Sequence, residues 1–350
     1  MEAKTKFPLY FLGRDCDANK NSVVIVADLR KNTSRLAIYK CENGDISQKT
    51  ESKYPTQDFQ SFSDLAKQFL QEQQVSDDFR VSIAVPGPVI NERCETPNLP
   101  WIVDLQTIKK DLQNDNILLI NDLEAVAYSL ADVYDHKFEI IHSTENKTIG
   151  NVAILAPGNG LGEAGLFYDG EFLRPFATEG GHTEFSPRND FEVEFYQFLN
   201  KIYGIVSWEK VLSKEGLYNI YRFMRDVGRH TESEELAKRM QTEPFLDVIA
   251  DEVKKGNSRL VDLTVKMFLE FLAREANNTV LKLKSTGGLI ITGEIIDKIF
   301  SFIDRDKFYK NFMISDRMGH LLRDIPIYIL RNENEIVEGA AYYGAFYNDK

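Results

Sequence analysis

A run of aliphatic residues from Ile117 to Ile120 stops abruptly at Asn121 and Asp122, and helix-forming residues follow. This pattern predicts a buried strand that leads directly into a helix, with two polar side chains at the carboxyl end of the strand. Open α/β sheets bind their ligands at that end of their strands. A carboxylate held there between two rigid elements can act as a general base, so Asp122 is the first candidate catalytic residue.

The same stretch of sequence allows a second interpretation of Asp122. Aspartate is a preferred N-cap residue, because its carboxylate accepts hydrogen bonds from the free backbone N–H groups of the first helical turn. In that case Asp122 would only begin the helix. The rest of the chain has to decide between a capping and a catalytic role.

The length and charge of the chain limit what it can be. With 350 residues, of which 43% are hydrophobic, it can fill the cores of two domains. Its net charge of −12 and its pI near 5.1 argue against a nucleic acid or an anionic membrane surface as a partner. Small molecules are the expected ligands.

The cysteines and the hydrophobic segments indicate the compartment. Cys16, Cys41 and Cys94 are odd in number, far apart and without metal-ligand spacing, so neither a disulfide framework nor a zinc site is expected. The first 20 residues contain one short apolar patch, which Pro8 interrupts, and it is too short for a signal peptide. No window approaches 18 uninterrupted apolar residues. These features predict a soluble cytoplasmic protein.

The order of predicted elements alternates between strands and helices twice, and a β-meander begins each half. Two such halves predict a duplicated α/β architecture with a cleft between them, in which Asp122 would lie. The predicted strands cover residues 23–27, 35–40, 79–85, 117–120, 152–156 and 289–292, and the predicted helices cover 61–73, 105–112, 191–203, 207–211, 216–224, 258–284 and 338–347.

Two glycine-containing turns stand out between these elements. Asn43-Gly44 is typical of a type I′ hairpin turn. Gly158, Gly160 and Gly162 follow the strand at 152–156, and such a glycine-rich turn lets backbone N–H groups approach an anion closely. The same run is also compatible with an ordinary hairpin.

Five runs, considered together, resemble the bacterial-type glucokinase family, which has the ribonuclease-H-like fold of actin and the sugar kinases. The resemblance extends from about residue 22 to 345, with the motifs in family order, and implies two actin-like α/β domains with an interdomain cleft. The small domain would comprise residues 1–122, with 1–20 as an extension, and a C-terminal helix at about 335–350, and the large domain residues 123–334. The matching runs are 120–125, 155–162, 179–187, 206–213 and 288–293.

The resemblance implies phosphoryl transfer from MgATP to the 6-hydroxyl of glucose, with Asp122 as the base that accepts the hydroxyl proton. A sugar presents a ring of hydroxyl donors and acceptors, which carboxylates, an amide and an imidazole can pair with. The residues that match the family's glucose-binding positions are Asn121, Glu179, His182 and Glu209, and Asn98 matches more loosely.

The resemblance also implies a nucleotide site and, as in many family members, a possible homodimer. Mg²⁺ and phosphate-binding loops would supply most of the charge neutralisation that phosphoryl transfer needs. Asp28 would hold Mg²⁺ through its water ligands. The expected nucleotide-binding residues are Asp28, Thr33, Gly158, Asn159, Gly160, Gly162 and Gly293.

The phosphate loop departs from the family pattern. In the family the first strand ends in Asp-x-Gly-Gly-Thr, whereas here Arg30 and Lys31 follow Asp28 and Leu29. These cations attract phosphate, but their side chains lie where bare backbone is expected, and neither residue readily adopts a positive φ. Asn159 replaces the usual threonine of the second loop, and Glu294 adds a carboxylate on the adenosine side.

The altered loop leaves two alternatives to an ATP-dependent glucokinase. One is a catalytically impaired, sugar-binding homologue that acts as a sensor or regulator. The other is a sugar kinase that uses a different phosphate donor, such as a polyphosphate, for which the two cations would be an advantage.

Overall fold

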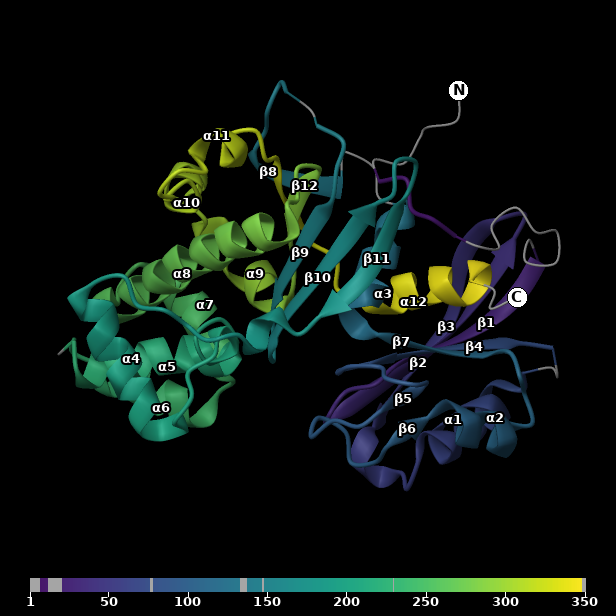
Figure 1. Ribbon diagram of the computed structural model, residues 1–350. Coiled ribbons are helices and arrows are strands. Elements are labelled where there is room, and N and C mark those ends of the chain that lie inside the picture. Colours follow the sequence, from purple (N-terminus) through teal and green to yellow (C-terminus); the bar gives the residue numbers. More distant parts are fainter. Residues whose placement is uncertain are drawn as a thin grey trace. The chain divides into compact units, whose positions relative to one another are not determined.

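The computed structural model describes residues 7–11, 21–75, 78–132, 137–146, 148–228 and 230–347. The chain divides into two compact units (Figure 1). The first unit consists of Met1–Asp135, Asp169–Ala177 and Asn334–Lys350, and the second consists of His136–Tyr168 and Thr178–Glu333.

The first unit contains a five-stranded sheet of order β3-β2-β1-β4-β7. Strands β1, β2 and β3 are antiparallel neighbours, whereas β1, β4 and β7 run parallel, so their carboxyl ends share one edge of the sheet. The strands are β1 (Asn21–Asp28), β2 (Thr33–Glu42), β3 (Asp45–Pro55), β4 (Arg80–Val85) and β7 (Ile117–Asn121), with a separate pair β5 (Arg93–Cys94) and β6 (Val103–Asp104).

Helices cover both faces of this sheet (Figure 1). Side chains alternate along the strands, so Ile83 joins a core with Leu65 of α1 and Ile108 of α2, while Ser82 faces Gly344 of α12. The helical elements are α1 (Phe62–Gln73), α2 (Leu105–Leu112), α3 (Asp122–Ser129) and α12 (Glu335–Phe346), with the short turns η2 (Thr56–Asp58) and η3 (Leu130–Asp132).

The C-terminal helix α12 belongs to the first unit, and the first segment of this unit continues past residue 122 to Asp135. Gly339 of α12 packs against the backbone carbonyl of Ala125 in α3, at a distance that leaves no room for a Cβ atom. This close packing keeps α3 in the same unit as α12. The segment Asp169–Ala177 also belongs to the first unit, which the sequence pattern did not indicate.

The second unit contains the strand order β10-β9-β12-β13-β8. Strands β9, β12 and β13 are parallel, and β10 and β8 are antiparallel to their neighbours. The strands are β8 (Phe138–His142), β9 (Val152–Pro157), β10 (Leu161–Tyr168), β12 (Gly288–Ile291) and β13 (Ile327–Leu330), while β11 (Leu173–Thr178) belongs largely to the first unit.

A long central helix, α8, organises the helical part of the second unit (Figure 1). Its residues Val265, Phe268 and Leu272 are buried in the main hydrophobic core. The helical elements are α4 (Asp190–Tyr203), α5 (Lys214–Asp226), α6 (Glu234–Thr242), α7 (Phe245–Lys255), α8 (Arg259–Leu283), α9 (Glu294–Ile299), α10 (Arg305–Phe312) and α11 (Gly319–Leu322), with η5 (Gly180–His182), η6 (Trp208–Lys210) and η7 (Phe300–Phe302).

Several local predictions are confirmed. The hairpin between β2 and β3 has φ of 56° at Asn43 and 89° at Gly44, as a type I′ turn requires. Helix α2 has the predicted bounds, and α8 lies within the predicted range 258–284. In the described ranges no helix is long and apolar enough to cross a membrane. Cys16 lies outside those ranges, and Cys41 and Cys94 are buried and form no disulfide with a described residue.

The described part of the N-terminal extension packs on the first unit. Leu9 forms a parallel bridge with Leu173, and Tyr10 N–H donates to the Leu173 carbonyl at 3.0 Å. Phe11 is 9% exposed, and its ring lies 5.4 Å from that of Tyr128 and 5.6 Å from that of Phe346. This segment therefore extends the hydrophobic core beside α3 and α12.

We expect Phe11→Ala to destabilise the first unit by about 3 kcal/mol, because it removes a buried aromatic ring and leaves a cavity. Urea unfolding in a Trp208→Phe background, followed by Trp101 fluorescence, reports on this unit. Phe167→Ala, whose side chain is 53% exposed, serves as the control and should change stability by less than about 0.5 kcal/mol. Equal effects of the two substitutions would contradict the packing role of Phe11.

Candidate active site

At the junction between β7 and α3, the N-cap of the helix is Asn121 and not the candidate catalytic residue Asp122. Asn121 is the N-cap of α3: its Oδ1 accepts hydrogen bonds from the N–H groups of Leu123 at 2.9 Å and Glu124 at 3.3 Å. Its Nδ2 donates to the Gly87 carbonyl at 3.0 Å. Asp122 is the first helical residue, and its Oδ1 also accepts from Leu123 N–H at 2.9 Å. Helix capping therefore does not depend on Asp122 alone.

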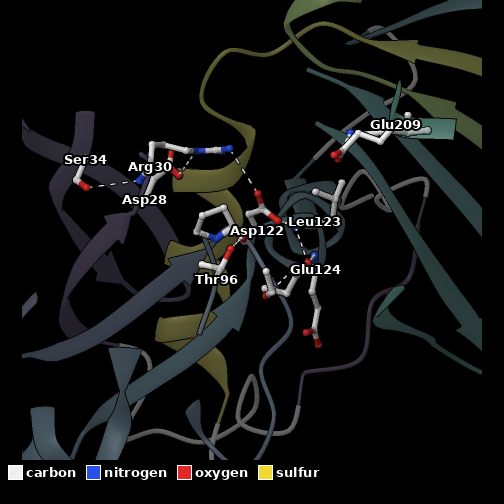
Figure 2. A network of polar contacts seen from close by, with 12 residues as sticks. Asp28, Arg30, Ser34, Thr96, Asp122, Leu123, Glu124 and Glu209 are labelled. Atoms are coloured by element: carbon white, nitrogen blue, oxygen red, sulfur yellow. Dashed lines mark hydrogen bonds and ion pairs between the residues drawn. The ribbon is translucent and has the colours of Figure 1, made fainter. Parts of the chain in front are cut away.

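Asp122 and Asp28 are linked by one guanidinium group (Figure 2). Arg30 donates through Nε to Asp28 Oδ1 at 2.7 Å and through Nη1 to Asp122 Oδ2 at 3.4 Å. Asp28 is 4% exposed and Asp122 8%, whereas the Arg30 side chain remains about a third exposed, at 31%. Burial opposes the charge of Arg30, but attraction to the two carboxylates outweighs it and raises the pKa of Arg30.

The sheet explains why these residues meet. Asp28 ends β1 and is paired with Ala84 of β4, while Val85 of β4 is paired with Asn121 of β7. The parallel register brings the ends of β1 and β7 to the two sides of β4. The sequence indicated both strand ends and both carboxylates, but the bridging role of Arg30 was missed.

The turn from β1 to β2 forms without glycine. Arg30 and Lys31 are not among the residues with positive φ, so the strain expected at these positions does not arise. Arg30 N–H approaches Ser34 Oγ at 3.5 Å, and the Arg30 carbonyl accepts from Thr56 Oγ1 at 2.6 Å. These buried hydroxyls shape the turn, while Lys31 and the predicted nucleotide residue Thr33 remain exposed.

Asn98, the loosely matched sugar residue, lies in an exposed loop of the first unit. Its backbone N–H donates to Thr96 Oγ1 at 3.3 Å, and that hydroxyl donates to the Pro86 carbonyl at 3.2 Å. Within the described ranges, its side chain has no hydrogen-bond partner. The amide of Asn98 is thus available to a ligand.

In the second unit, the glycine-rich turn is joined to Glu209 of η6. Gly158 N–H donates to the Gly160 carbonyl at 2.8 Å, and Leu161 N–H donates to Glu209 Oε2 at 3.1 Å. Asn159 is exposed at the tip of the turn, and Gly162 lies opposite Ala156 in the β9–β10 ladder. Glu209, which was predicted to bind sugar, therefore also supports the turn that was predicted to bind phosphate.

Gly293 is required where α9 begins. Its φ is +102°, and a Cβ atom there would lie 2.7 Å from the Pro157 carbonyl oxygen. The start of α9 is thus held beside the glycine-rich turn. Glu294, the carboxylate that departs from the family pattern, pairs with Lys214 at 2.6 Å, and Lys214 N–H donates to the Gly158 carbonyl. Its negative charge is therefore compensated close to the turn.

Glu179 and His182 lie together at the η5 turn. Glu179 Oε2 is 3.9 Å from His182 Nε2, and both side chains are at least half exposed, so they can meet a ligand. Trp208 N–H donates to the Thr183 carbonyl at 2.9 Å, which ties the η5 segment to η6 and Glu209. The structure thus brings together three of the predicted sugar-binding residues.

The residues at Asp28 fit only a weakly held divalent cation. Within the described ranges no group of three His, Cys, Asp or Glu side chains is placed to hold a metal. Asp28 Oδ1 is used by Arg30, whereas its Oδ2 accepts no hydrogen bond from the described residues. One carboxylate oxygen suits Mg²⁺ that keeps several waters and binds mainly through phosphates.

The chain as a whole is similar to known glucokinases. The glucokinase family model matches residues 25–346. The glucokinase of Trichormus variabilis is 32% identical over 309 residues, which cover 84% of this chain and 90% of that protein. The glucokinase of Synechocystis is 29% identical over 314 residues, covering 84% and 88%.

Solved structures show the same fold. Glucokinase from an Antarctic psychrotroph superposes with a TM-score of 0.75 at 23% identity, covering 92% of this chain and 98% of that one. Glucokinase from Balamuthia mandrillaris in complex with glucose gives a TM-score of 0.74 at 18% identity, covering 95% and 96%. These neighbours establish the actin-like fold of the sugar kinases for both units.

Proposed function

Because the chain belongs to the glucokinase family, we propose that it transfers the terminal phosphoryl group of ATP to the 6-hydroxyl of glucose, giving glucose 6-phosphate and ADP. The observation that carries this proposal is the position of Asp122. Asn121 caps α3, so the buried Asp122 carboxylate is held at the carboxyl edge of parallel strands, where α/β proteins bind ligands.

In this proposal Asp122 accepts the proton of the glucose 6-hydroxyl as that oxygen attacks the phosphoryl group. Glu179, His182 and Glu209 bind other hydroxyls, and the exposed amide of Asn98 adds a further donor and acceptor. Asn121 positions Asp122, and one hydrogen of its Nδ2 remains for a sugar hydroxyl after the bond to Gly87.

The nucleotide would bind through the backbone of Gly158, Asn159, Gly160 and Gly162, with Gly293 at the start of α9 and Thr33 on the first unit. Mg²⁺ supplies charge neutralisation on the phosphates when it is bound. Asp28 would hold the water shell of the ion through Oδ2, while Arg30 keeps the Asp28 carboxylate in place.

We expect Asp122→Asn to lower kcat by about 10³-fold, because an amide cannot accept the hydroxyl proton, while glucose affinity stays within a few-fold. A coupled glucose-6-phosphate assay and calorimetric titration with glucose measure the two quantities. Asp111→Asn is a control in the same unit, at an exposed position. A variant of Asp122 with near-normal kcat would exclude this residue as the base.

The ion pair between Arg30 and Asp122 favours one alternative, a sugar-binding homologue with little kinase activity, because it occupies the candidate base. Titration with glucose and, separately, with a non-hydrolysable MgATP analogue distinguishes the two. Measurable binding of both glucose and the MgATP analogue, together with turnover, supports the kinase. Glucose binding without nucleotide binding or product supports the sensor, and turnover with polyphosphate in place of ATP supports a changed donor.

If Arg30 is part of a working site, Arg30→Gly should lower kcat/KM for ATP by about 10-fold to 100-fold, because it leaves two buried carboxylates without their shared cation. Lys31→Gly tests the neighbouring cation, which is exposed and contacts neither carboxylate, and should have a much smaller effect. Steady-state kinetics with varied ATP measure both. A clear gain of activity in Arg30→Gly would instead indicate an ATP site that Arg30 impairs.

We also propose a cytoplasmic location, because the number and spacing of the three cysteines fit neither a disulfide framework nor a zinc site, and a homodimer, on the basis of the family resemblance. Light scattering coupled to size-exclusion chromatography should give about twice the chain mass of 40.1 kDa. A mass of one chain at micromolar concentration would contradict the dimer.

A further inference from the structure

Two glutamates outside the proposed active site lie buried side by side in the second unit. Glu163 of β10 is 3% exposed and Glu275 of α8 is 0% exposed. Thr279 of α8 joins them: its hydroxyl lies 3.4 Å from Glu163 Oε2 and 2.8 Å from the backbone carbonyl of Glu275. Ionising both of these buried carboxylates would carry a large electrostatic cost, so their burial favours one proton held between them.

The surrounding donors indicate which carboxyl group carries the proton. Asn278 Nδ2 donates to Glu275 Oε2 at 2.7 Å, and Lys282 Nζ lies 3.3 Å from Glu275 Oε1. Among the described residues, the donor near Glu163 Oε2 is the Thr279 hydroxyl, at 3.4 Å, and the single hydrogen of that hydroxyl has a closer acceptor, the Glu275 carbonyl at 2.8 Å. The Asn278 amide and the Lys282 ammonium group thus both interact with the Glu275 carboxylate.

Glu163 Oε1 has no hydrogen-bond donor in the described part of the chain. An ionised carboxylate in this position would leave a buried acceptor unsatisfied, whereas a carboxylic acid can donate to Glu275. Burial, and then the charge of Glu275, raise the pKa of Glu163 to about 8. Burial also raises the pKa of Glu275, although Asn278 and Lys282 oppose this effect.

The Glu163 carboxyl group touches the turn that carries two candidate sugar-binding residues. A Cβ atom on Gly180 would lie 2.1 Å from Glu163 Oε2 and 2.7 Å from its Cδ, so the carboxyl group packs directly on Gly180. Thr178 Oγ1 donates to the Glu163 carbonyl at 3.0 Å and accepts from Gly180 N–H at 3.2 Å. Glu163 thus contacts the turn through both its side chain and its backbone.

We propose that Glu163 and Glu275 form a proton-sharing positioning pair, in which neutral Glu163 holds the Gly180 turn in the conformation that presents Glu179 and His182 to the sugar. This proposal rests on the proposed glucose-binding role of that turn. Loss of the proton places a second negative charge beside Gly180 and repels Glu275. Glucose affinity then falls, while the phosphoryl-transfer step, which depends on Asp122, is little affected.

The charged groups that face Glu163 come from α8 and from the η5 segment. From α8 the facing groups are Glu275 and Lys282. From the η5 segment they are Glu179 and His182, which are exposed and pair with each other. Within the described ranges, no further charged side chain contacts Glu163.

The test is calorimetric titration with glucose between about pH 6 and pH 9.5, with kcat measured at saturating glucose. Wild-type affinity should fall by about tenfold as the pH rises through the pKa of Glu163, a coupling of ordinary size between protonation and binding. Glu163→Gln, a neutral isostere that keeps a donor, should retain the affinity seen at neutral pH and lose the alkaline decline. Its kcat should stay within about threefold of wild type.

The control is Glu270→Gln, an exposed substitution on the same helix, which should keep the wild-type pH profile. A decline of affinity in Glu163→Gln that matches wild type would overturn the proposal. So would a wild-type affinity that stays constant to pH 9.5, or a Glu163→Gln variant that binds glucose much more weakly at pH 7.

A protein that binds no glucose at any pH would contradict the proposed function instead, and thermal unfolding then tests the pair alone. The folded pKa of Glu163 lies above its unfolded value, so its favourable contribution is full below the unfolded pKa and is lost as the pH rises through the folded pKa. The Tm of Glu163→Gln should therefore rise relative to wild type between about pH 5 and pH 8. A constant difference would show that the two glutamates share no proton.

Discussion

The parallel pairing of β1, β4 and β7 is the constraint on which the first unit depends. It aligns the carboxyl ends of three strands at one edge and places Asp28 and Asp122 on either side of β4. The helices α3 and α12 are fixed to the same sheet, and the N-terminal segment at Phe11 covers their junction. The candidate catalytic carboxylate of Asp122 is thereby held by rigid elements, which is the preorganisation that proton transfer requires.

Asp28 and Asp122 are both buried at this edge, and buried carboxylates need a partner that compensates their charge. In the glucokinase family pattern the following loop is bare backbone, whereas this chain supplies Arg30. The guanidinium satisfies both carboxylates at once, and Ser34 and Thr56 shape a turn that needs no positive φ. The same change can support or impede phosphoryl transfer, since a fixed cation both neutralises the carboxylates and occupies the candidate base, Asp122.

The second unit uses buried polar groups in a different way. Glu209 accepts a hydrogen bond from the glycine-rich turn, and Glu163 packs beneath Gly180 against Glu275. Each carboxyl group supports the backbone of a loop that carries candidate binding residues. Such buried groups are costly unless they are satisfied, so they fix a single loop conformation where an apolar contact would tolerate several.

The sequence by itself determined the local elements: the Asn43-Gly44 hairpin, the helices α2 and α8, and the strand that ends at Asn121, because these depend on residues a few positions apart. Tertiary structure alone decided that Arg30 meets Asp122, 92 positions away, and that Glu163 meets the helix carrying Thr279, 116 positions away. It also placed α3 in the first unit. Partners at such separations are chosen by sheet register and helix packing, which no local sequence pattern records.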